Sequence, residues 1–140
     1  MKIAVIGSRG IKIPDIEKYL PKECSEIVSG GAIGVDTCAA NFARERNIPL
    51  TEFLPLYKKY GRAAPIVRNK QIVEYADEVI AFWDGKSRGT FFVIQYCKET
   101  GTPCKVVQIE IEYFLYKTVE YCKENNIDTF KAMCYNIIGR

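Results

Sequence analysis

Short apolar runs alternate with amphipathic stretches along most of this chain, and the alternation restricts the possible folds more than any single motif does. Five runs rich in β-branched and aromatic residues predict strands at Ile3–Ile6, Glu26–Ser29, Leu50–Leu54, Val79–Trp83 and Cys104–Ile109. Helical spacing between these runs predicts helices at about Pro14–Leu20, Ile33–Arg46, Pro65–Tyr75 and Gly89–Thr100. This pattern favours an α/β fold, in which a parallel sheet of about five strands has helices on both faces.

The composition agrees with a globular domain and excludes several kinds of site. The chain has 140 residues, of which 48% are hydrophobic, and this is enough for a proper core. Its 20 basic and 17 acidic residues give a net charge of +3, which is too balanced to indicate nucleic-acid binding by charge alone. The sequence has no histidine, which excludes Ser-His-Asp and Cys-His catalytic sites, and we predict no metal site.

The cysteines and the first residues of the chain predict where in the cell the protein is located. Lys2 opens the first predicted strand directly, so we expect no signal peptide. The cysteines are scattered, lack a Cys-x-x-Cys pair and fall mostly on predicted apolar faces, which favours reduced thiols and a cytoplasmic location. No apolar run is long enough to span a bilayer, and we expect no membrane partner. The six cysteines are Cys24, Cys38, Cys97, Cys104, Cys122 and Cys134.

Glycine-rich turns follow three of the predicted strands. They are Gly7-Ser-Arg-Gly10, Gly30-Gly-Ala-Ile-Gly34 and Asp84-Gly-Lys-Ser-Arg-Gly-Thr90. In a Rossmann-like order the first strand is central, the fourth lies beside it, and a crevice opens at their carboxyl ends. The three turns then converge on one rim of the sheet. One such turn is a weak signal, because glycines close many junctions, but three in this arrangement are a stronger one.

The turn after the fourth predicted strand has the residues of a phosphate site. Backbone N–H groups in a glycine-rich turn approach an anion closely, and the dipole of the following helix adds to the attraction. Lys86 and Arg88 add positive charge, while Ser87 and Thr90 add hydroxyl donors. We therefore expect a small phosphate-containing ligand here, and no other cofactor is indicated.

Three charged side chains near the turns are candidates that also have a structural explanation. Arg9 suits bidentate phosphate contact, or is solvated in an ordinary turn. Asp36 could accept a ligand hydroxyl, but a helix N-terminus stabilises it whether or not it binds anything. Asp84 is the best-placed carboxylate for a ligand hydroxyl or a metal-bound water. Asp84 and Asp36 are also weak candidates for a catalytic role, because one acid alone says little about catalysis.

The predicted helix at Pro65–Tyr75 contains a polar residue on its apolar face. Asn69 falls in the middle of that face, so it must find partners, either by pinning a glycine turn or by contacting the ligand. Arg68, at the edge of the face, could reach the rim. Arg62 lies in an expected mobile loop, Tyr60–Arg62, that could cover a base or a phosphate.

Residues 110–140 are predicted to form a separate C-terminal extension. Apolar residues recur there at helical spacing on both sides of a break at Asn125-Asn126. We expect a helical hairpin that either caps the domain formed by residues 1–109 or forms a dimer interface. A homo-oligomer is therefore expected.

Together these motifs resemble the SLOG superfamily. The resemblance lies in Gly7-Ser-Arg, Ser29-Gly-Gly-Ala-x-Gly-Val-Asp36, Tyr60-Gly-Arg-Ala-Ala64, Arg68-Asn69 and Ala81-Phe-Trp-Asp-Gly-x-Ser-x-Gly-Thr90. It is closest to the small stand-alone bacterial branch that is similar to the YspA group, and it covers about residues 1–109. The resemblance implies a Rossmann-like sheet that binds nucleotides or nucleotide-derived ligands.

Two related groups imply alternative functions. LOG phosphoribohydrolases cleave nucleoside monophosphates to base and ribose 5-phosphate, and they carry a Pro-Gly-Gly-x-Gly-Thr turn followed by glutamates. Here Gly85-Lys-Ser-Arg-Gly-Thr90 is followed by Phe91-Phe92-Val93, so the expected glutamate is missing, although Arg68 matches the arginine of their Arg-Lys pair. DprA-like proteins, which bind single-stranded DNA, share the features at Ser29–Asp36 and Arg68-Asn69.

The sequence therefore favours a domain that binds or senses a nucleotide or a nucleotide-derived phosphate ligand. One alternative is N-glycosidic cleavage of a nucleoside 5′-monophosphate, with Asp84 or Asp36 in place of the glutamate. The other is a DprA-like core that binds single-stranded DNA, which the mild charge disfavours. The predicted ligand-binding residues are Gly7, Ser8, Arg9, Ser29, Gly30, Gly31, Gly34, Asp36, Arg62, Arg68, Asn69, Asp84, Gly85, Ser87, Arg88, Gly89 and Thr90.

Overall fold

The structure is a computed structural model that describes residues 1–109, 119–126 and 128. The chain divides into two units, Met1–Gln108 and Ile109–Arg140. The predicted extension over residues 110–140 lies largely outside the described residues, of which 119–124 are helical. The helical hairpin and the homo-oligomer therefore stay predictions.

The first unit is built on a five-stranded sheet with the order β3-β2-β1-β4-β5. Its strands are β1 (Lys2–Gly7), β2 (Glu26–Ser29), β3 (Leu50–Glu52), β4 (Glu78–Trp83) and β5 (Cys104–Gln108). Every neighbouring pair is parallel. The predicted α/β fold is thus confirmed, including the central first strand with the fourth strand beside it.

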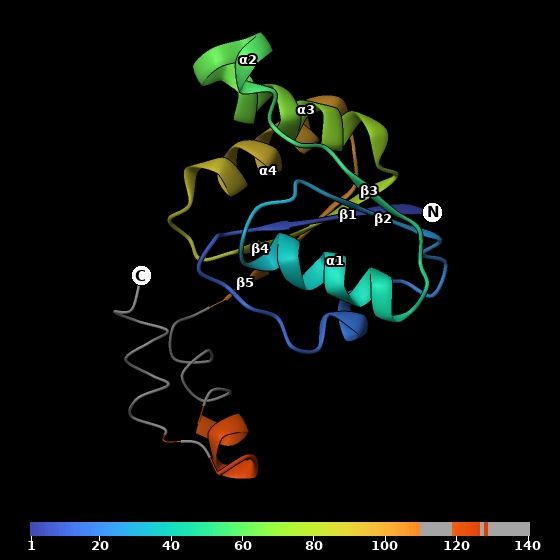
Figure 1. Ribbon diagram of the computed structural model, residues 1–140. Coiled ribbons are helices and arrows are strands. Elements are labelled where there is room, and N and C mark those ends of the chain that lie inside the picture. Colours follow the sequence, from blue (N-terminus) through green and yellow to red (C-terminus); the bar gives the residue numbers. More distant parts are fainter. Residues whose placement is uncertain (110–118, 127, 129–140) are drawn as a thin grey trace. The chain divides into compact units, whose positions relative to one another are not determined.

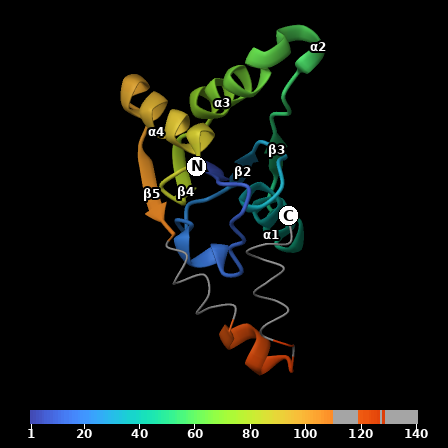
Figure 2. The same cartoon turned by 90° about the vertical axis from the view of Figure 1, so that its left-hand side faces the viewer.

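Helices cover both faces of this sheet (Figure 1). The helix α1 (Val35–Glu45) and the 3₁₀ turn η1 (Ile16–Tyr19) lie on one face, and α3 (Ala64–Tyr75) and α4 (Arg88–Thr100) lie on the other. The short helix α2 (Tyr57–Tyr60) and the 3₁₀ turn η2 (Gly61–Ala63) lead into α3 and contain no buried residue. Figures 1 and 2 show α2 beyond the N-terminal end of α3, away from the sheet.

Alternate residues of the central strand pack against opposite helix layers. Ala4 and Ile6 belong to a buried cluster that includes Ile72 of α3 and Val93 of α4. Ile3 and Val5 are fully buried, and their side chains point to the opposite face, toward α1. Burial on both faces explains why β1 is a continuous apolar run rather than an alternating one.

Three predicted elements differ from the structure. The helix predicted at Pro14–Leu20 is reduced to the single turn η1, which has no side-chain cap. The third strand ends at Glu52 rather than Leu54, because its neighbour β2 ends at Ser29, the residue paired with Glu52. The loop predicted at Tyr60–Arg62 is instead helical, in α2 and η2, and leads directly into α3.

Candidate functional site

The turns that follow β1, β2 and β4 lie together at the carboxyl edge of the sheet. The N–H of Ser8, just after β1, donates to the carbonyl of Phe82 in β4 at 3.1 Å. On the other side, the carbonyl oxygen of Arg9 would lie 2.4 Å from a Cβ atom placed on Gly34. The β1 turn thus contacts both the β2 turn and the end of β4. The strand order also reverses between β1 and β4, which is where ligands bind in sheets of this kind.

The Asp84–Thr90 turn is held by its own side chains. The carboxylate of Asp84 accepts the N–H groups of Lys86 and Ser87, each at 2.8 Å. Ser87 is the N-cap of α4, and its hydroxyl accepts the N–H of Thr90 at 3.5 Å. The indole Nε1 of Trp83 donates to the carbonyl of Ser87 at 3.1 Å. The start of α4 is therefore fixed from both sides without any ligand.

The backbone donors at the start of α4 are only partly used by this turn. The first N–H groups of a helix have no partner within it. The N–H of Phe91 makes the first bond of the helix ladder, to Ser87, and the N–H of Thr90 bonds the cap. Among the described residues, the N–H groups of Arg88 and Gly89 are the donors of the first turn that neither the cap nor the helix ladder uses. They form an exposed pair with the helix dipole behind them.

The carboxyl group of Asp84 is anionic and is not suited to act as an acid. Its partial burial would raise the pKa, but the N–H groups of Ser87 and Lys86, together with the Ser8 hydroxyl, outweigh that effect and hold the pKa below its ordinary value. As a carboxylate it orders its own turn. It is therefore the weaker of the two catalytic candidates named from the sequence.

The hydroxyl of Ser8 is buried at the junction of β1 and β4. Ser8 is 3% exposed, and its Oγ is the one buried side-chain polar atom of the described residues that has no hydrogen-bond partner. It lies close enough to Asp84 to help lower the pKa of that carboxyl, but the geometry does not make a hydrogen bond. An unsatisfied buried hydroxyl costs about 1–3 kcal/mol, and a ligand atom at this point would offset the cost.

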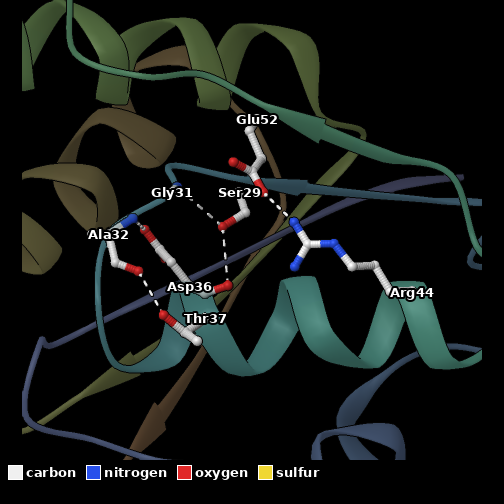
Figure 3. A network of polar contacts seen from close by, with 7 residues as sticks. All are labelled: Ser29, Gly31, Ala32, Asp36, Thr37, Arg44 and Glu52. Atoms are coloured by element: carbon white, nitrogen blue, oxygen red, sulfur yellow. Dashed lines mark hydrogen bonds and ion pairs between the residues drawn. The ribbon is translucent and has the colours of Figure 1, made fainter.

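The turn after β2 is filled by its own aspartate (Figure 3). Asp36, in the first turn of α1, is 7% exposed, and its Oδ2 accepts the N–H of Ala32 at 3.1 Å. The hydroxyl of Ser29 lies 3.5 Å from both the carbonyl of Asp36 and the N–H of Gly31. The hydroxyl of Thr37 donates to the carbonyl of Ala32 at 3.1 Å. The carboxylate thus occupies the position that an anion would take in a free glycine turn.

Arg68 connects α3 to the same turn. Its Nη1 donates to the carbonyl of Gly30 at 2.6 Å, and its Nε donates to Oδ1 of Asn69 at 2.9 Å. Asn69 therefore finds its partner in Arg68, which agrees with the interpretation that it helps to pin a glycine turn. Burial lowers the pKa of the Arg68 guanidinium, while the neighbouring carboxylate of Asp36 raises it. This arginine supports the turn from inside the fold.

Burial also sets the protonation of Asp36. Burial raises the pKa of this carboxyl to about 6, although the N–H of Ala32 and the charge of Arg68 act in the opposite direction. Arg68 and Asp36 both lie close to Gly30, since a Cβ atom on that glycine would meet Nη1 of the first at 2.6 Å and Oδ2 of the second at 3.0 Å. The charge of Glu52 raises the pKa further.

Packing explains some of the predicted glycines and not others. A Cβ atom on Gly7 would lie 2.6 Å from Cγ2 of Val35, and one on Gly34 would meet the backbone of Arg9. These positions need glycine whether or not a ligand binds. Gly89 differs, because a Cβ atom there meets nothing within 4 Å and the backbone has no positive φ. The fold itself does not require glycine at the start of α4.

The remaining predicted residues are exposed. Arg9 and Arg88 are exposed in the β1 turn and at the start of α4. Arg62 is exposed on η2, and no contact among the described residues joins it to the turns. The sequence prediction did not include Leu54, whose Cδ2 atom would lie 2.4 Å from a Cβ atom on Gly31 and which therefore lies against the β2 turn. Pro55 was the available signal, because a proline there favours the end of a strand before Leu54.

Within the part of the chain that the structure describes, no three cysteine, aspartate or glutamate side chains are grouped so that they could hold a metal ion. Among the same residues, no helix is long and apolar enough to cross a membrane. The five described cysteines are free thiols.

Comparisons with models of known protein families, with curated proteins and with solved structures found no match. The resemblance to the SLOG superfamily thus rests on the motifs.

Proposed function

We propose that this protein binds or senses a nucleotide or a nucleotide-derived phosphate ligand at the β1–β4 switch point, with the phosphate at the start of α4. The observation that carries the proposal is the buried Ser8 hydroxyl without a partner. Buried polar atoms in native proteins are nearly always paired, so an unpaired one at a predicted ligand site is a reason to expect a ligand atom there.

The electrostatics of the α4 start support a phosphate as the bound group. The N–H groups of Arg88 and Gly89 are available, and a helix N-terminus favours a negative charge. The guanidinium of Arg88 is exposed and can turn toward a bound anion. The open space at Gly89 lets the backbone approach a phosphate closely.

One observation favours the alternative of N-glycosidic cleavage. A general acid needs a pKa near the working pH, and burial gives Asp36 a pKa of about 6. If the protein is an enzyme, Asp36 rather than Asp84 is the residue expected to carry a proton. Asp36 is 7% exposed, however, and its Oδ2 accepts a hydrogen bond from within its own turn. Binding without cleavage is therefore the preferred function.

The test is a calorimetric titration of the protein with AMP, GMP, CMP, UMP and ribose 5-phosphate, followed by chromatography of each mixture for free base. We expect at least one ligand to bind and no base to be released.

In Ser8→Ala, the affinity should fall about tenfold or more, while the free energy of unfolding without ligand should rise by about 1 kcal/mol. These opposite changes separate a ligand-binding hydroxyl from a structural one.

The double variant Arg88→Ala, Thr90→Ala tests the position of the phosphate. It should lose most of the affinity, because it removes the exposed cation of Arg88 beside the helix start. Thr90 is 4% exposed and its hydroxyl accepts from Ser87 at 3.3 Å, so Thr90→Ala alone separates a change in the turn from the loss of a ligand contact. Lys98→Ala is the matched control, because Lys98 is also exposed and lies in the last turn of the same helix. Full affinity in the double variant would show that the phosphate lies elsewhere, and release of free base would favour the enzyme.

A further inference from the structure

Two cysteines lie together where the end of α4 leads into β5 (Figure 2). Cys97, near the end of α4, is 1% exposed, and Cys104, the first residue of β5, is half-buried. Cys104 is paired with Val79 of β4 in the parallel sheet, so these two side chains point to the same face. Val79 and Cys97 belong to one buried cluster, and Cys104 packs against it. Both thiols therefore lie in the same region of the core.

The backbone between the two cysteines turns back on itself. Gly101, the C-cap of α4, has φ 74°, and its N–H donates to the carbonyl of Cys97. The N–H of Thr102 donates to the same carbonyl at 3.0 Å. The carbonyl of Pro103 then accepts an N–H of β4 at 2.9 Å, which fixes the chain to the sheet just before Cys104. The fold thus holds the two cysteines close together.

The two thiols are close enough to act on each other. Their side-chain interaction, together with burial, raises the pKa of Cys97, and the same interaction lowers the pKa of Cys104. Burial and the charge of Glu78 oppose the second shift, while the charge of Lys98 adds to it. Cys97 therefore keeps its proton, and Cys104 becomes a thiolate more readily. The thiolate is the form of cysteine that attacks a disulfide.

The two cysteines differ in how accessible they are. A buried free cysteine often serves only as a small apolar residue, which accounts for Cys97 taken alone. Cys104 is half-buried and begins β5, which is an edge strand of the sheet, so a reagent can reach it from solution. An accessible cysteine beside a second, protected one is the arrangement found in redox-sensing pairs.

We propose that Cys97 and Cys104 are a reversible dithiol–disulfide pair that is oxidised by a small-molecule disulfide of the glutathione class. The thiolate of Cys104 attacks one sulfur of glutathione disulfide, forms a mixed disulfide and releases one glutathione thiolate. The sulfur of Cys97 then attacks that of Cys104, and the second glutathione thiolate leaves. Each released thiolate takes up one of the two protons that the cysteines lose. Two protein thiols are thereby oxidised to one disulfide, and one glutathione disulfide is reduced to two glutathiones.

The test equilibrates the full-length protein with mixtures of glutathione and glutathione disulfide, blocks the free thiols with N-ethylmaleimide and analyses a tryptic digest by mass spectrometry. Trypsin cleaves after Lys98, so the two cysteines fall in separate peptides, residues 89–98 and 99–105. We expect these peptides to lose both blocked thiols and to be joined by a disulfide that excess glutathione reverses. If both peptides stay blocked at every ratio, or if Cys104 keeps glutathione, the proposal is wrong.

Cys97→Ala is the matched variant, because alanine keeps a small apolar side chain in the core and removes only the second thiol. Glutathione should stay on Cys104 in this variant, whereas the wild-type protein releases it. Cys104→Ala should leave Cys97 unmodified, because a thiol that is 1% exposed is protected from the reagent. Cys38, half-buried on α1 at the other face of the sheet, is the internal control and should join neither peptide. Equal retention of glutathione in the wild type and in Cys97→Ala would overturn the proposal.

Discussion

The glycine turns after β2 and β4 resemble each other in sequence but differ in burial. Each contains glycines and one aspartate whose carboxylate accepts N–H groups of its own turn. Asp36, in the first turn of α1 directly after the β2 turn, is 7% exposed, and Arg68 supports that turn through the carbonyl of Gly30. Asp84, in the β4 turn, is exposed and fixes only the segment before α4. The two turns therefore differ in what remains available to a ligand.

Burial, rather than glycine content, is what distinguishes the two turns. In the β2 turn a carboxylate is already in place, and a phosphate beside it would be repelled. In the β4 turn the carboxylate takes the N–H groups of Lys86 and Ser87, and those of Arg88 and Gly89 stay available. We interpret the β2 turn as a support and the β4 turn as the phosphate site.

Gly34→Ala should have the largest effect on stability. Gly34 has φ 89° and ψ −124°, a conformation that L-residues rarely adopt, and a Cβ atom there would lie 2.4 Å from the carbonyl oxygen of Arg9. Backbone strain and overpacking together should lower the free energy of unfolding by about 3 kcal/mol or more. Urea denaturation followed by circular dichroism measures the change.

Gly61→Ala is the control for that substitution. Gly61 also has a positive φ, of 57°, but a Cβ atom there meets nothing within 4 Å. Its ψ of −131° lies outside the left-handed helical region, so this variant should show the conformational cost alone, about 1–3 kcal/mol. Equal losses in the two variants would mean that the close approach of the β1 and β2 turns contributes nothing to stability.

The buried carboxyl of Asp36 should make stability depend on pH. Its folded-state pKa of about 6 lies above the ordinary value of 3.8, so the folded protein keeps a proton that the unfolded chain has released. This stabilising contribution is fully present below pH 3.8 and is lost as the pH rises through about 6. The loss should be about 2–3 kcal/mol, since one pKa unit corresponds to about 1.4 kcal/mol.

The measurement is the difference in free energy of unfolding between the wild-type protein and Asp36→Asn from pH 3.5 to pH 8. That difference removes the titration of all other groups, while the charges that face Asp36, those of Arg68 and Glu52, stay in place. The relative stability of the wild type should decrease across the window and become constant above it. A flat difference, or one that rises with pH, would contradict the burial assigned to this carboxyl.

The sequence was sufficient for the sheet and for the convergence of the three turns at one edge of it. Two-sided burial makes the strands continuous apolar runs, and parallel strands bring their carboxyl ends to one edge, so the convergence of the turns followed from the alternation alone. Local sequence determines these features.

The sequence was not sufficient for the state of the β2 turn. Its anion position is filled by Asp36 because Gly34 turns the chain back and because Arg68, 38 residues from Gly30, bonds to the carbonyl of that glycine. The unpaired hydroxyl of Ser8 likewise depends on where β4 lies. These features result from contacts between distant segments, and the pattern of one segment does not reveal them.

Gly89→Ala should have the smallest effect on stability and the clearest effect on binding. Alanine favours a helix over glycine, and the position is open, so the free energy of unfolding should rise by about 0.5–1 kcal/mol. The added methyl group would stand between the helix start and a bound phosphate, so the affinity for a mononucleotide should fall about tenfold.

Gly101→Ala, at the other end of α4 with φ 74°, should instead lower stability and leave the affinity unchanged. An unchanged affinity in Gly89→Ala would mean that the phosphate does not contact the first turn of α4, and the contrast between the two glycine turns would then concern folding alone.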